Sequence, residues 1–329
     1  MKIGRKTVLV TGAGGFIGSH LVESLVRSGA RVRAMVHYDA RPDHSNLEFL
    51  AADVRAGLEV ISGNVEDPFF VSTAVKGSEV VFHLAALIAI PYSYLAPASY
   101  VAANVQGTLN VLEACRTHGV ARLVHTSTSE TYGTALYTPI DERHPLQAQS
   151  PYSASKIGAD KLAESYHLAF GLPVATIRPF NTYGPRQSAR AVVPAIISQA
   201  LSSSMIRLGS LHPVRDLNFV QDTVRGFLAV AEADEAVGQV VNVGSGSAIS
   251  IGDLAALILR SLGLKKEIVT DTERVRPEMS EVLTLLCDRR KAETIAGWRP
   301  RVTLEQGLAE TIEFVRSHSD RFRPEVYNR

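Results

Sequence analysis

The chain has 329 residues, of which 46% are hydrophobic and 20% charged, and its formal net charge is +1. These values are ordinary for a soluble globular protein, and the balanced charge gives no support for binding to nucleic acid or to an anionic membrane surface. The two cysteines, Cys115 and Cys287, lack the spacing of a zinc site or a disulfide framework. No stretch has the pattern of a membrane span or a signal peptide, so we expect a cytoplasmic protein without a bound metal.

The first predicted element is a strand over residues 7–10, which leads into the glycine-rich segment 11–18. Apolar side chains then recur at helical spacing until Gly29 ends the predicted helix. Glycines in this position allow a tight turn and let backbone amides at the helix N-terminus approach a pyrophosphate. A strand, a glycine turn and a helix in this order predict a dinucleotide site, with cofactor contacts from Gly12, Gly15, Phe16, Ile17 and Gly18.

The end of the second predicted strand, over residues 32–36, bears on the choice of cofactor. An acidic residue usually stands there to bind the adenosine ribose, whereas this chain has its nearest acid, Asp39, further along. Arg33, His37 and Arg41 could instead contact a 2′-phosphate. We therefore expect NADP or NAD as the cofactor, with NADP favoured.

Further apolar segments predict strands over residues 58–61, 80–86, 123–125, 174–178 and 240–243. They alternate with helical patterns, so we predict an α/β fold built on a doubly wound parallel sheet. We expect His83 to be held by hydrogen bonds within the sheet. Further cofactor contacts are expected around the strand ends, from Asn64, Val65, Leu84, Ala85, Ala86, Asn104 and Thr126.

After Pro179 the pattern loosens into shorter elements separated by proline- and glycine-rich joints. We therefore expect two unequal parts. A dinucleotide-binding domain takes residues 1–180, with residues 215–250 returning to it, and a smaller substrate-binding lobe takes residues 181–214 and 251–329. The apolar and aromatic segment 87–94, broken by a proline, predicts a loop over the site.

The residues that suggest chemistry follow the fifth strand. The segment 126–133 places hydroxyl groups and the carboxylate of Glu130 at a strand end, and Ser150 and Pro151 then begin a helix. Tyr152 and Lys156 lie one turn apart on a single face of that helix. An ammonium beside a phenol lowers the phenol pKa, so Tyr152 is expected to act as a base near neutral pH.

Several of these motifs together resemble the extended short-chain dehydrogenases that act on sugar nucleotides. The motifs are TGAGGFIG at 11–18, HLAA at 83–86, Tyr152 with Lys156, and RPFNTYGPR at 178–186. Within that family, HTSTSETYG at 125–133, PYSASKIGAD at 151–160 and QSARAVVP at 187–194 look most like the LegB-type nucleotide-N-acetylglucosamine 4,6-dehydratases of legionaminic acid biosynthesis. The resemblance implies a Rossmann fold and a lyase that acts on UDP- or GDP-GlcNAc.

The resemblance also implies how the catalytic residues divide the reaction. Tyr152, helped by Thr128 and Lys156, would take the proton of the sugar 4-hydroxyl during oxidation at C4. Glu130 would remove the proton at C5, which the new ketone acidifies. Loss of water from C6 and return of the hydride would give a 4-keto-6-deoxy sugar, with the cofactor held tightly between turnovers.

Ser129 leaves alternatives open, because the best-known sugar-nucleotide dehydratases have an aspartate at this position. Thr-Ser-Glu is shared with the UDP-glucuronate decarboxylases, and the basic run 289–291 could hold a carboxylate. A decarboxylase is therefore the second hypothesis and a 4-epimerase the third. A regulatory protein that binds NAD(P) without catalysis is a further alternative, although such proteins usually lack the tyrosine or the lysine.

For the diphosphate of the substrate, the family resemblance points to Asn181, Arg215 and Arg276. Arginine suits phosphate because its planar guanidinium donates two hydrogen bonds at once. In the family, the helices that correspond to residues 104–118 and 152–169 commonly pair across a two-fold axis. A homodimer held by a four-helix bundle is therefore expected.

Overall fold

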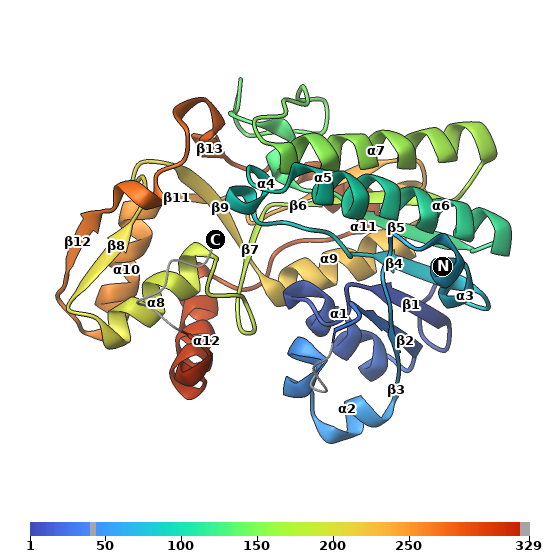
Figure 1. Ribbon diagram of the computed structural model, residues 1–329, viewed down its shortest axis with the longest axis horizontal. Helices are drawn as coiled ribbons and strands as arrows, with labels where there is room; N and C mark the ends of the chain where they lie inside the picture. Colours follow the sequence, from blue (N-terminus) through green and yellow to red (C-terminus); the bar gives the residue numbers. More distant parts are fainter. Residues whose placement is uncertain (40–43, 323–329) are drawn as a thin grey trace.

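The computed structural model describes residues 1–39 and 44–322. Arg41, one of the three cations expected near a 2′-phosphate, lies outside these residues. Figure 1 shows two parts, a large sheet covered by helices and a smaller lobe beside it. None of the helices in the described part of the chain is long and apolar enough to cross a membrane.

The central sheet has seven strands in the order β10-β6-β5-β4-β1-β2-β3, and every neighbouring pair is parallel. The order reverses between β1 and β4, so the carboxyl ends of these two strands flank the crevice where ligands bind in such sheets. The predicted doubly wound parallel sheet is confirmed. Its strands are β1 (Thr7–Thr11), β2 (Arg31–Val36), β3 (Leu58–Ser62), β4 (Val80–His83), β5 (Arg122–Thr126), β6 (Val174–Pro179) and β10 (Val240–Val243).

Helices cover both faces of this sheet (Figure 1). Each face has its own apolar core, as expected for strands that are buried on both sides. One layer contains α3 (Pro68–Val75), α6 (Gly107–His118) and α7 (Pro151–Phe170), and the other contains α1 (Phe16–Arg27), α9 (Val220–Glu232) and α11 (Arg290–Ala296). Shorter helices in the connections are α2 (Ala52–Ala56), α4 (Ile90–Ser93) and α5 (Pro97–Tyr100).

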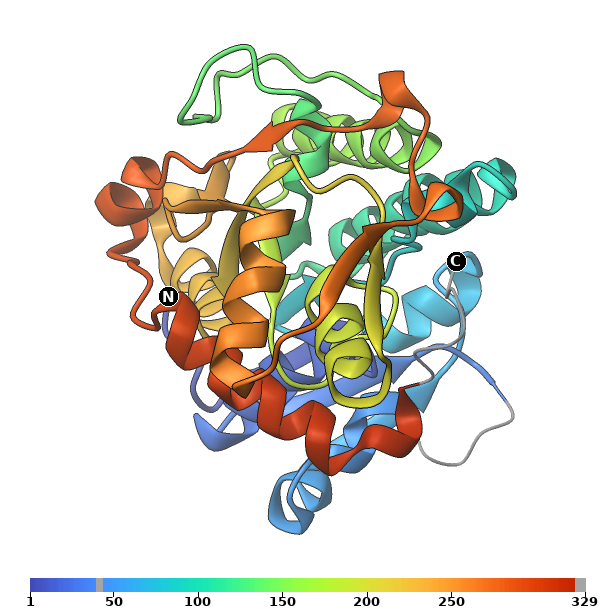
Figure 2. The ribbon, with the colours of Figure 1, turned by 90° about the vertical axis from the view of Figure 1, so that its left-hand side faces the viewer.

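The smaller lobe has a separate core and faces the viewer in Figure 2. Its strands are β7 (Asn181–Tyr183), β8 (Met205–Leu208), β9 (Val214–Phe219), β11 (Ala248–Ser250), β12 (Glu267–Thr270) and β13 (Thr284–Leu285). Its helices are α8 (Val192–Ser202), α10 (Ile251–Leu262) and α12 (Leu304–Ser317). Strand β9 is the centre of the lobe, because β7, β11 and β13 all pair with it.

Local sequence signals explain where the helices begin. The Ser150 hydroxyl accepts a hydrogen bond from Ser153 N, and Pro151 takes the first helical position of α7, as predicted. The helix predicted over 104–118 differs at its start, because Val101–Gln106 forms a π-helical turn before α6. Such turns are frequent at functional sites. The segment 87–94, predicted as a loop, contains the short helix α4.

The expected division into two parts needs two changes at its boundaries. Residues 215–219 lie in β9 and residues 248–250 in β11, so both segments belong to the sheet of the lobe, although 215–250 were expected to return to the larger domain. Conversely, Ala292 of α11 and Trp298 pack into the core of the large sheet, although 251–329 were expected in the lobe. With these segments reassigned, the division into a dinucleotide domain and a substrate lobe stays a proposal.

Candidate active site

The glycine turn lies at the carboxyl end of β1, against the end of β4. Gly12 has a positive φ of 70°, and a Cβ there would lie 2.8 Å from Ala85 N. A Cβ on Gly18 would lie 2.2 Å from Gly12 O. Only glycine fits at these two positions, because the turn folds back onto α1 and onto Ala85. Gly15, Phe16 and Ile17 lie between them at the start of α1, so the backbone is shaped as a pyrophosphate site requires.

The connection after β4 is fixed to the same turn. The Thr11 hydroxyl accepts hydrogen bonds from Leu84 N and Ala85 N, both at 3.1 Å. It also lies 2.8 Å from His83 Nδ1, and His83 Nε2 lies 3.1 Å from the Thr108 hydroxyl. The predicted structural role of His83 is confirmed. The segment Leu84–Ala86 therefore lies where the sequence analysis expected it, beside the glycine turn.

The end of β2 does not bring the expected cations together. The Arg33 guanidinium lies 3.1 Å from Glu59 Oε2 and donates to the carbonyl oxygens of Ala74 and Lys76. These contacts hold it away from the strand end, so its expected role at a 2′-phosphate is wrong. His37 is exposed directly after β2. After β3, Asn64 is exposed and Val65 is buried against Gly107.

Asn104 lies in the π-helical turn and is 1% exposed. Its side-chain oxygen accepts from Leu87 N, and its amide donates to Leu87 O and to the Ser155 hydroxyl. These bonds fix the loop after β4 to the helix that carries Tyr152 and Lys156. Asn104 thus positions the site, and a direct contact with the cofactor stays a prediction.

Lys156 reaches the end of β5 from α7. Its ammonium donates a 2.6 Å hydrogen bond to Thr126 O, so the helix and the strand end are joined at the site. Burial lowers the pKa of Lys156 to about 8, and the negative charge of Asp160 opposes this effect. The Thr126 hydroxyl oxygen is buried and has no hydrogen-bond partner among the described residues, which makes it available to a ligand.

Tyr152 is buried beside Thr128, which caps the short turn Ser129–Tyr132. Burial raises the pKa of the Tyr152 phenol, the hydrogen bond with Thr128 opposes the rise, and the charge of Glu130 adds to it. The expected lowering of this pKa by Lys156 is therefore wrong for the structure as described. The physical reason is that burial outweighs the other effects and the ammonium hydrogen-bonds Thr126 O.

Glu130 is half-buried in the same turn, whereas Ser129 is 1% exposed. The negative charge of Glu130 contributes to raising the pKa of Tyr152 and opposes the lowering of the pKa of Arg215, so its carboxylate lies near both groups. The turn thus brings the predicted catalytic residues Thr128, Glu130 and Tyr152 to one place.

A buried cluster that the sequence analysis did not identify supports this end of the sheet. Asp160 follows Lys156 by one turn and accepts hydrogen bonds from the Ser127 hydroxyl and Arg178 Nη2, both at 2.6 Å. His125 Nε2 lies 3.0 Å from the same carboxylate. The nearby Arg178 guanidinium holds the pKa of Asp160 well below its usual value, although burial opposes this. The spacing of Tyr152, Lys156 and Asp160 on one helix face was the available signal.

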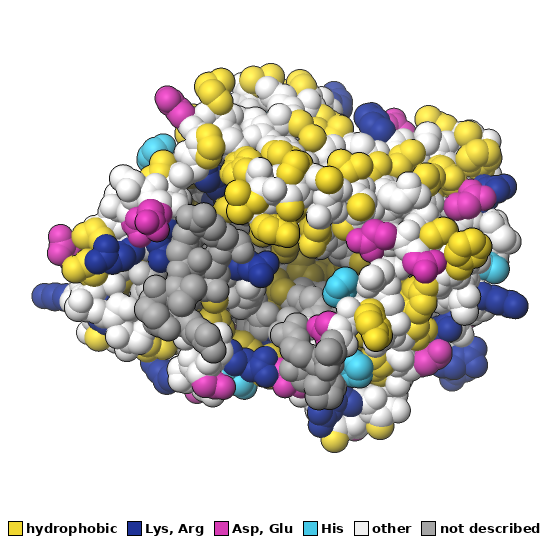
Figure 3. All heavy atoms as spheres, in the orientation of Figure 1, with side chains coloured by type: hydrophobic (Ala, Val, Ile, Leu, Met, Phe, Trp, Pro, Cys, Tyr) yellow, Lys and Arg dark blue, Asp and Glu magenta, His cyan; other side chains and the backbone are white. Residues whose placement is uncertain are grey.

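The lobe contributes the predicted substrate residues. Arg215 Nη2 lies 3.1 Å from Glu281 Oε1, and Arg276 Nη1 lies 3.7 Å from the same oxygen. Arg276 Nη1 and Asn181 Oδ1 are buried and have no hydrogen-bond partner among the described residues. Unpaired buried polar atoms are costly and often mark ligand sites. Figure 3 shows a hollow between the sheet and the lobe, with Lys and Arg side chains at its edges.

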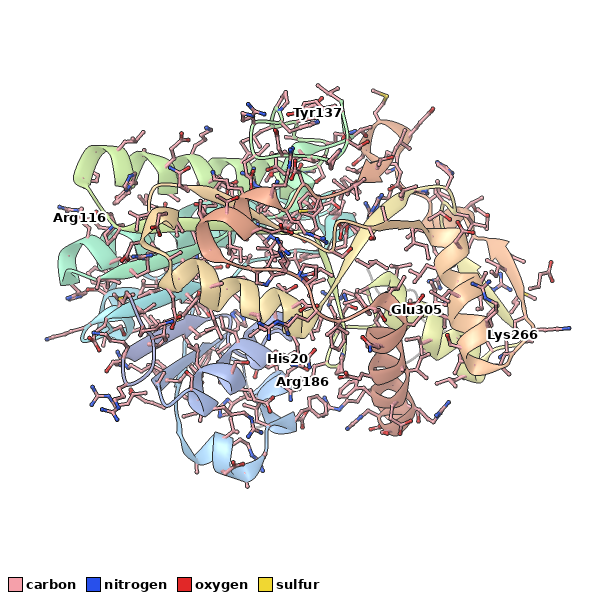
Figure 4. The ribbon with its side chains drawn as sticks, turned by 180° about the vertical axis from the view of Figure 1, so that it is seen from behind. His20, Arg116, Tyr137, Arg186, Lys266 and Glu305 are labelled. Carbon is pink, nitrogen blue, oxygen red and sulfur yellow. The ribbon has the colours of Figure 1, made fainter. Side chains whose placement is uncertain are left out.

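The motif 178–186 connects the two parts. Arg186, at its end, forms a 2.8 Å ion pair with Glu23 of α1, and His20 Nε2 lies 2.9 Å from Pro185 O. Figure 4 shows His20 and Arg186 next to each other. Burial, together with the charge of Arg186, lowers the pKa of His20 to about 4. The motif therefore holds the lobe against the helix that begins at the glycine turn.

The basic run 289–291 makes contacts of its own. Arg289 and Arg290 pair with Glu293 and Asp288, and Lys291 donates to Gln239. With their charges paired, the two arginines give no support to the carboxylate site of the second hypothesis. Over residues 1–39 and 44–322, no group of three or more His, Cys, Asp or Glu side chains could hold a metal ion.

Comparisons with known proteins agree with this arrangement. The family model described as GDP-mannose 4,6 dehydratase matches residues 9–311. The dTDP-glucose 4,6-dehydratase of Streptomyces griseus is 34% identical over 97% of each chain. The UDP-glucose 4-epimerase of Mycolicibacterium smegmatis is 33% identical over 94% of this chain and 99% of the relative.

Among solved structures, the dTDP-glucose 4,6-dehydratase DesIV of Streptomyces venezuelae, with NAD bound, superposes with a TM-score of 0.87. It is 30% identical, and the match covers 97% of this chain and 99% of that chain. The glycine turn, the Tyr152–Lys156 pair and these matches over nearly the whole chain agree. The chain therefore belongs to the extended short-chain dehydrogenase family of sugar-nucleotide dehydratases and epimerases, a family of enzymes.

Proposed function

We propose that this protein is a sugar-nucleotide 4,6-dehydratase that converts an NDP-N-acetylglucosamine into its 4-keto-6-deoxy product. The observation that carries the proposal is the place of Glu130, half-buried in the short turn that Thr128 caps. An epimerase needs only oxidation and reduction at C4. A dehydratase also needs a base at C5, and Glu130 supplies a carboxylate in the turn next to Thr128.

The residues around the glycine turn fit a nicotinamide dinucleotide, because close backbone contacts at Gly12 and Gly18 keep the turn tight and free of side chains at the start of α1. Gly12, Gly15 and Gly18 would hold the pyrophosphate. Thr126 and Lys156 would hold the nicotinamide end. When bound, the cofactor supplies a hydride acceptor and donor at the sugar.

For the oxidation at C4, Tyr152 takes the proton of the sugar 4-hydroxyl, and Thr128 hydrogen-bonds the same oxygen. Burial raises the pKa of the phenol, so Tyr152 first releases its proton to solvent and then acts as a phenolate base. Lys156 supplies a positive charge at this point, and Asp160 stabilises that charge. These residues serve the step that dehydratases and epimerases share.

For the elimination, Glu130 takes the proton from C5, next to the 4-ketone, and water leaves from C6. A protonated acid is needed at the departing hydroxyl. Ser129 is buried beside Glu130 and supplies no acid. We propose that Glu130 first takes the C5 proton and then delivers it to the departing hydroxyl, so that one carboxyl group serves both functions. The C5 hydrogen of the product then comes from solvent.

N-acetylglucosamine is the finer part of the substrate proposal, together with legionaminic acid biosynthesis. It is supported by the likeness of 125–133, 151–160 and 187–194 to the LegB-type enzymes. The named relatives act on glucose nucleotides. UDP and GDP remain alternatives for the nucleotide.

We propose NAD as the cofactor, which revises the preference for NADP. That preference rested on three cations, and Arg33 is engaged with Glu59 and with two carbonyl oxygens. The DesIV structure contains NAD. A comparison of the tightly bound nucleotide released from the denatured protein with NAD and NADP standards tests this assignment.

We also propose a cytoplasmic homodimer. Both cysteines are free and buried, as expected for a reducing compartment. Helices α6 and α7 pack side by side, and Val101, Leu168 and Phe170 are exposed apolar side chains on or beside them. Figure 3 shows hydrophobic side chains gathered over the upper part of the molecule, where Figure 1 has α4 to α7. Light scattering during gel filtration tests the dimer.

The activity is tested by separate incubation with UDP-GlcNAc, GDP-GlcNAc, dTDP-glucose and UDP-glucuronate, followed by mass spectrometry. Loss of one water from a GlcNAc nucleotide is the expected result. Loss of water from dTDP-glucose alone would keep the dehydratase and overturn the substrate. Loss of carbon dioxide from UDP-glucuronate would overturn the proposed reaction in favour of a decarboxylase.

A further inference from the structure

Glu281 lies between the two arginines proposed to bind the substrate diphosphate. It belongs to the segment 272–283, here called the strap, which connects β12 to β13 and arches over one side of the molecule in Figure 2. One oxygen of Glu281 lies 3.1 Å from Arg215 Nη2 and 3.7 Å from Arg276 Nη1. The side chains of Arg215 and Glu281 are 8% and 13% exposed, so water screens this pair only weakly.

The two arginines differ in how closely they contact Glu281 and in their other hydrogen bonds. Arg215 Nη1 donates to Val214 O at 3.0 Å, which fixes the guanidinium on β9. Arg276 Nη1 is buried, has no hydrogen-bond partner in the described part of the chain, and is too far from Glu281 for a good hydrogen bond. One carboxylate thus faces two guanidinium groups and satisfies only one of them. The cluster therefore keeps an unused hydrogen-bond donor on Arg276 and a net positive charge, and both are available to a bound anion.

The strap is tied to the catalytic end of the sheet. The Ser280 hydroxyl donates to Gln149 O and contacts the Tyr94 hydroxyl, both at 2.5 Å. Gln149 Nε2 donates to Met279 O at 3.0 Å. Val282 is buried in the same apolar cluster as Tyr132, which ends the turn of Thr128 and Glu130. Glu281 is therefore held at the arginines from both sides along the strap.

We propose that Glu281 competes with the diphosphate of the sugar nucleotide for Arg215 and Arg276, and so limits the affinity for the nucleotide. This inference rests on the proposed function. A diphosphate brings more negative charge than one carboxylate, and two anions within a few ångströms repel each other. When the nucleotide binds, the arginines turn their donors to phosphate oxygens and Glu281 loses its partner. When the nucleotide leaves, Glu281 restores the ion pair, which favours product release.

The test is calorimetric titration of the protein, with its own cofactor, with UDP, GDP and dTDP and with the monophosphate of whichever diphosphate binds. In Glu281→Gln, the binding of the diphosphate should tighten by roughly tenfold, because a repulsion is removed. The monophosphate should change less. Glu281→Asp keeps the negative charge, so its affinity for the diphosphate should stay within about twofold of that of the wild type in the same titrations. Glu278→Gln is the matched control, because Glu278 is exposed on the same strap, and it should bind as the wild type does.

Diphosphate binding that is unchanged or weaker in Glu281→Gln, with an unchanged unfolding midpoint, would overturn the competition. Weaker binding would show that Glu281 positions the arginines for phosphate. If none of the three diphosphates binds the wild-type protein, the proposed function itself fails. The wild-type titrations therefore separate the two failures.

Discussion

Two clusters of charge flank the site, and they are built differently. Asp160 and Arg178 lie in the large sheet with side chains 6% and 3% exposed, and the carboxylate has three partners. Glu281, Arg215 and Arg276 lie in the lobe, where one carboxylate serves two guanidinium groups and a buried donor has no partner among the described residues.

The difference separates positioning from binding. A fully paired buried carboxylate fixes the geometry of the elements around it, because removing one partner leaves an unpaired buried charge. A cluster with an unpaired donor retains capacity for a ligand. The cluster in the sheet therefore fixes the positions of Tyr152 and Lys156. In the lobe, the arginines can exchange Glu281 for the phosphates of a ligand.

The largest expected effect is on catalysis, at Tyr152 in the part of the site that the large sheet holds in place. Tyr152→Phe should lower kcat by roughly a thousandfold with little change in stability, because the hydroxyl that moves the proton is removed. Steady-state kinetics on the accepted substrate measure this. Tyr137→Phe is the control, since Tyr137 is an exposed tyrosine on the loop after the catalytic turn (Figure 4). A loss of less than tenfold in Tyr152→Phe would remove the phenol from the mechanism.

The second expected effect is on stability. Asp160→Asn should lower the free energy of unfolding by about 3–5 kcal/mol, because Arg178 would be left as a buried charge without its partner. Urea unfolding measures this. Glu164→Gln, one turn further along α7, removes an exposed ion pair with Lys161 and should cost under about 1 kcal/mol. Equal losses in both variants would contradict the claim that the buried, fully paired Asp160 fixes the structure around it.

The third effect concerns pH. The pKa of Lys156 is lowered by burial from 10.5 to about 8. Between these values the unfolded chain binds more protons, so this residue makes the folded state more stable as pH rises. The ammonium itself is lost over the same range. We predict that kcat/KM falls above about pH 8 while the contribution of Lys156 to stability increases. A rate that stays constant up to pH 10.5 would contradict the role of the charge.

The smallest effect on stability is expected in the lobe. Arg276→Ala should weaken the binding of the nucleoside diphosphate by about tenfold and change the free energy of unfolding by less than about 0.5 kcal/mol. Calorimetric titration and urea unfolding on the same sample give both values. A large loss of stability with unchanged binding would make Arg276 a structural residue and would contradict the assignment of ligand binding to the cluster in the lobe.

The sequence predicted the large sheet well because its signals are local. Each of the seven strands is a short segment rich in apolar residues, and the glycine turn has the strand and helix that define it on either side. The Tyr152–Lys156 pair was found for the same reason, as two residues on one helical turn. Asp160 continues this face and could have been found by extending the spacing by one more turn.

The rest depends on contacts between distant parts of the chain. Glu281 is separated from Arg215 by 66 residues, and no periodicity connects them. Arg33 was expected at a phosphate from its place near the strand end, but its partner Glu59 is on the neighbouring strand. The pKa of Tyr152 also could not be predicted, because burial, its largest determinant, depends on how α7 packs.

The central claim is that Glu130 acts at C5 after Tyr152 has acted at C4. The most direct measurement is turnover of the accepted sugar nucleotide in D₂O by the wild-type protein and by Glu130→Gln, with deuterium at C5 followed by NMR. We expect a wild-type product that carries solvent deuterium at C5, and a variant that neither eliminates water nor exchanges the C5 proton. Exchange at C5 that persists in Glu130→Gln would contradict it and assign the base to another residue.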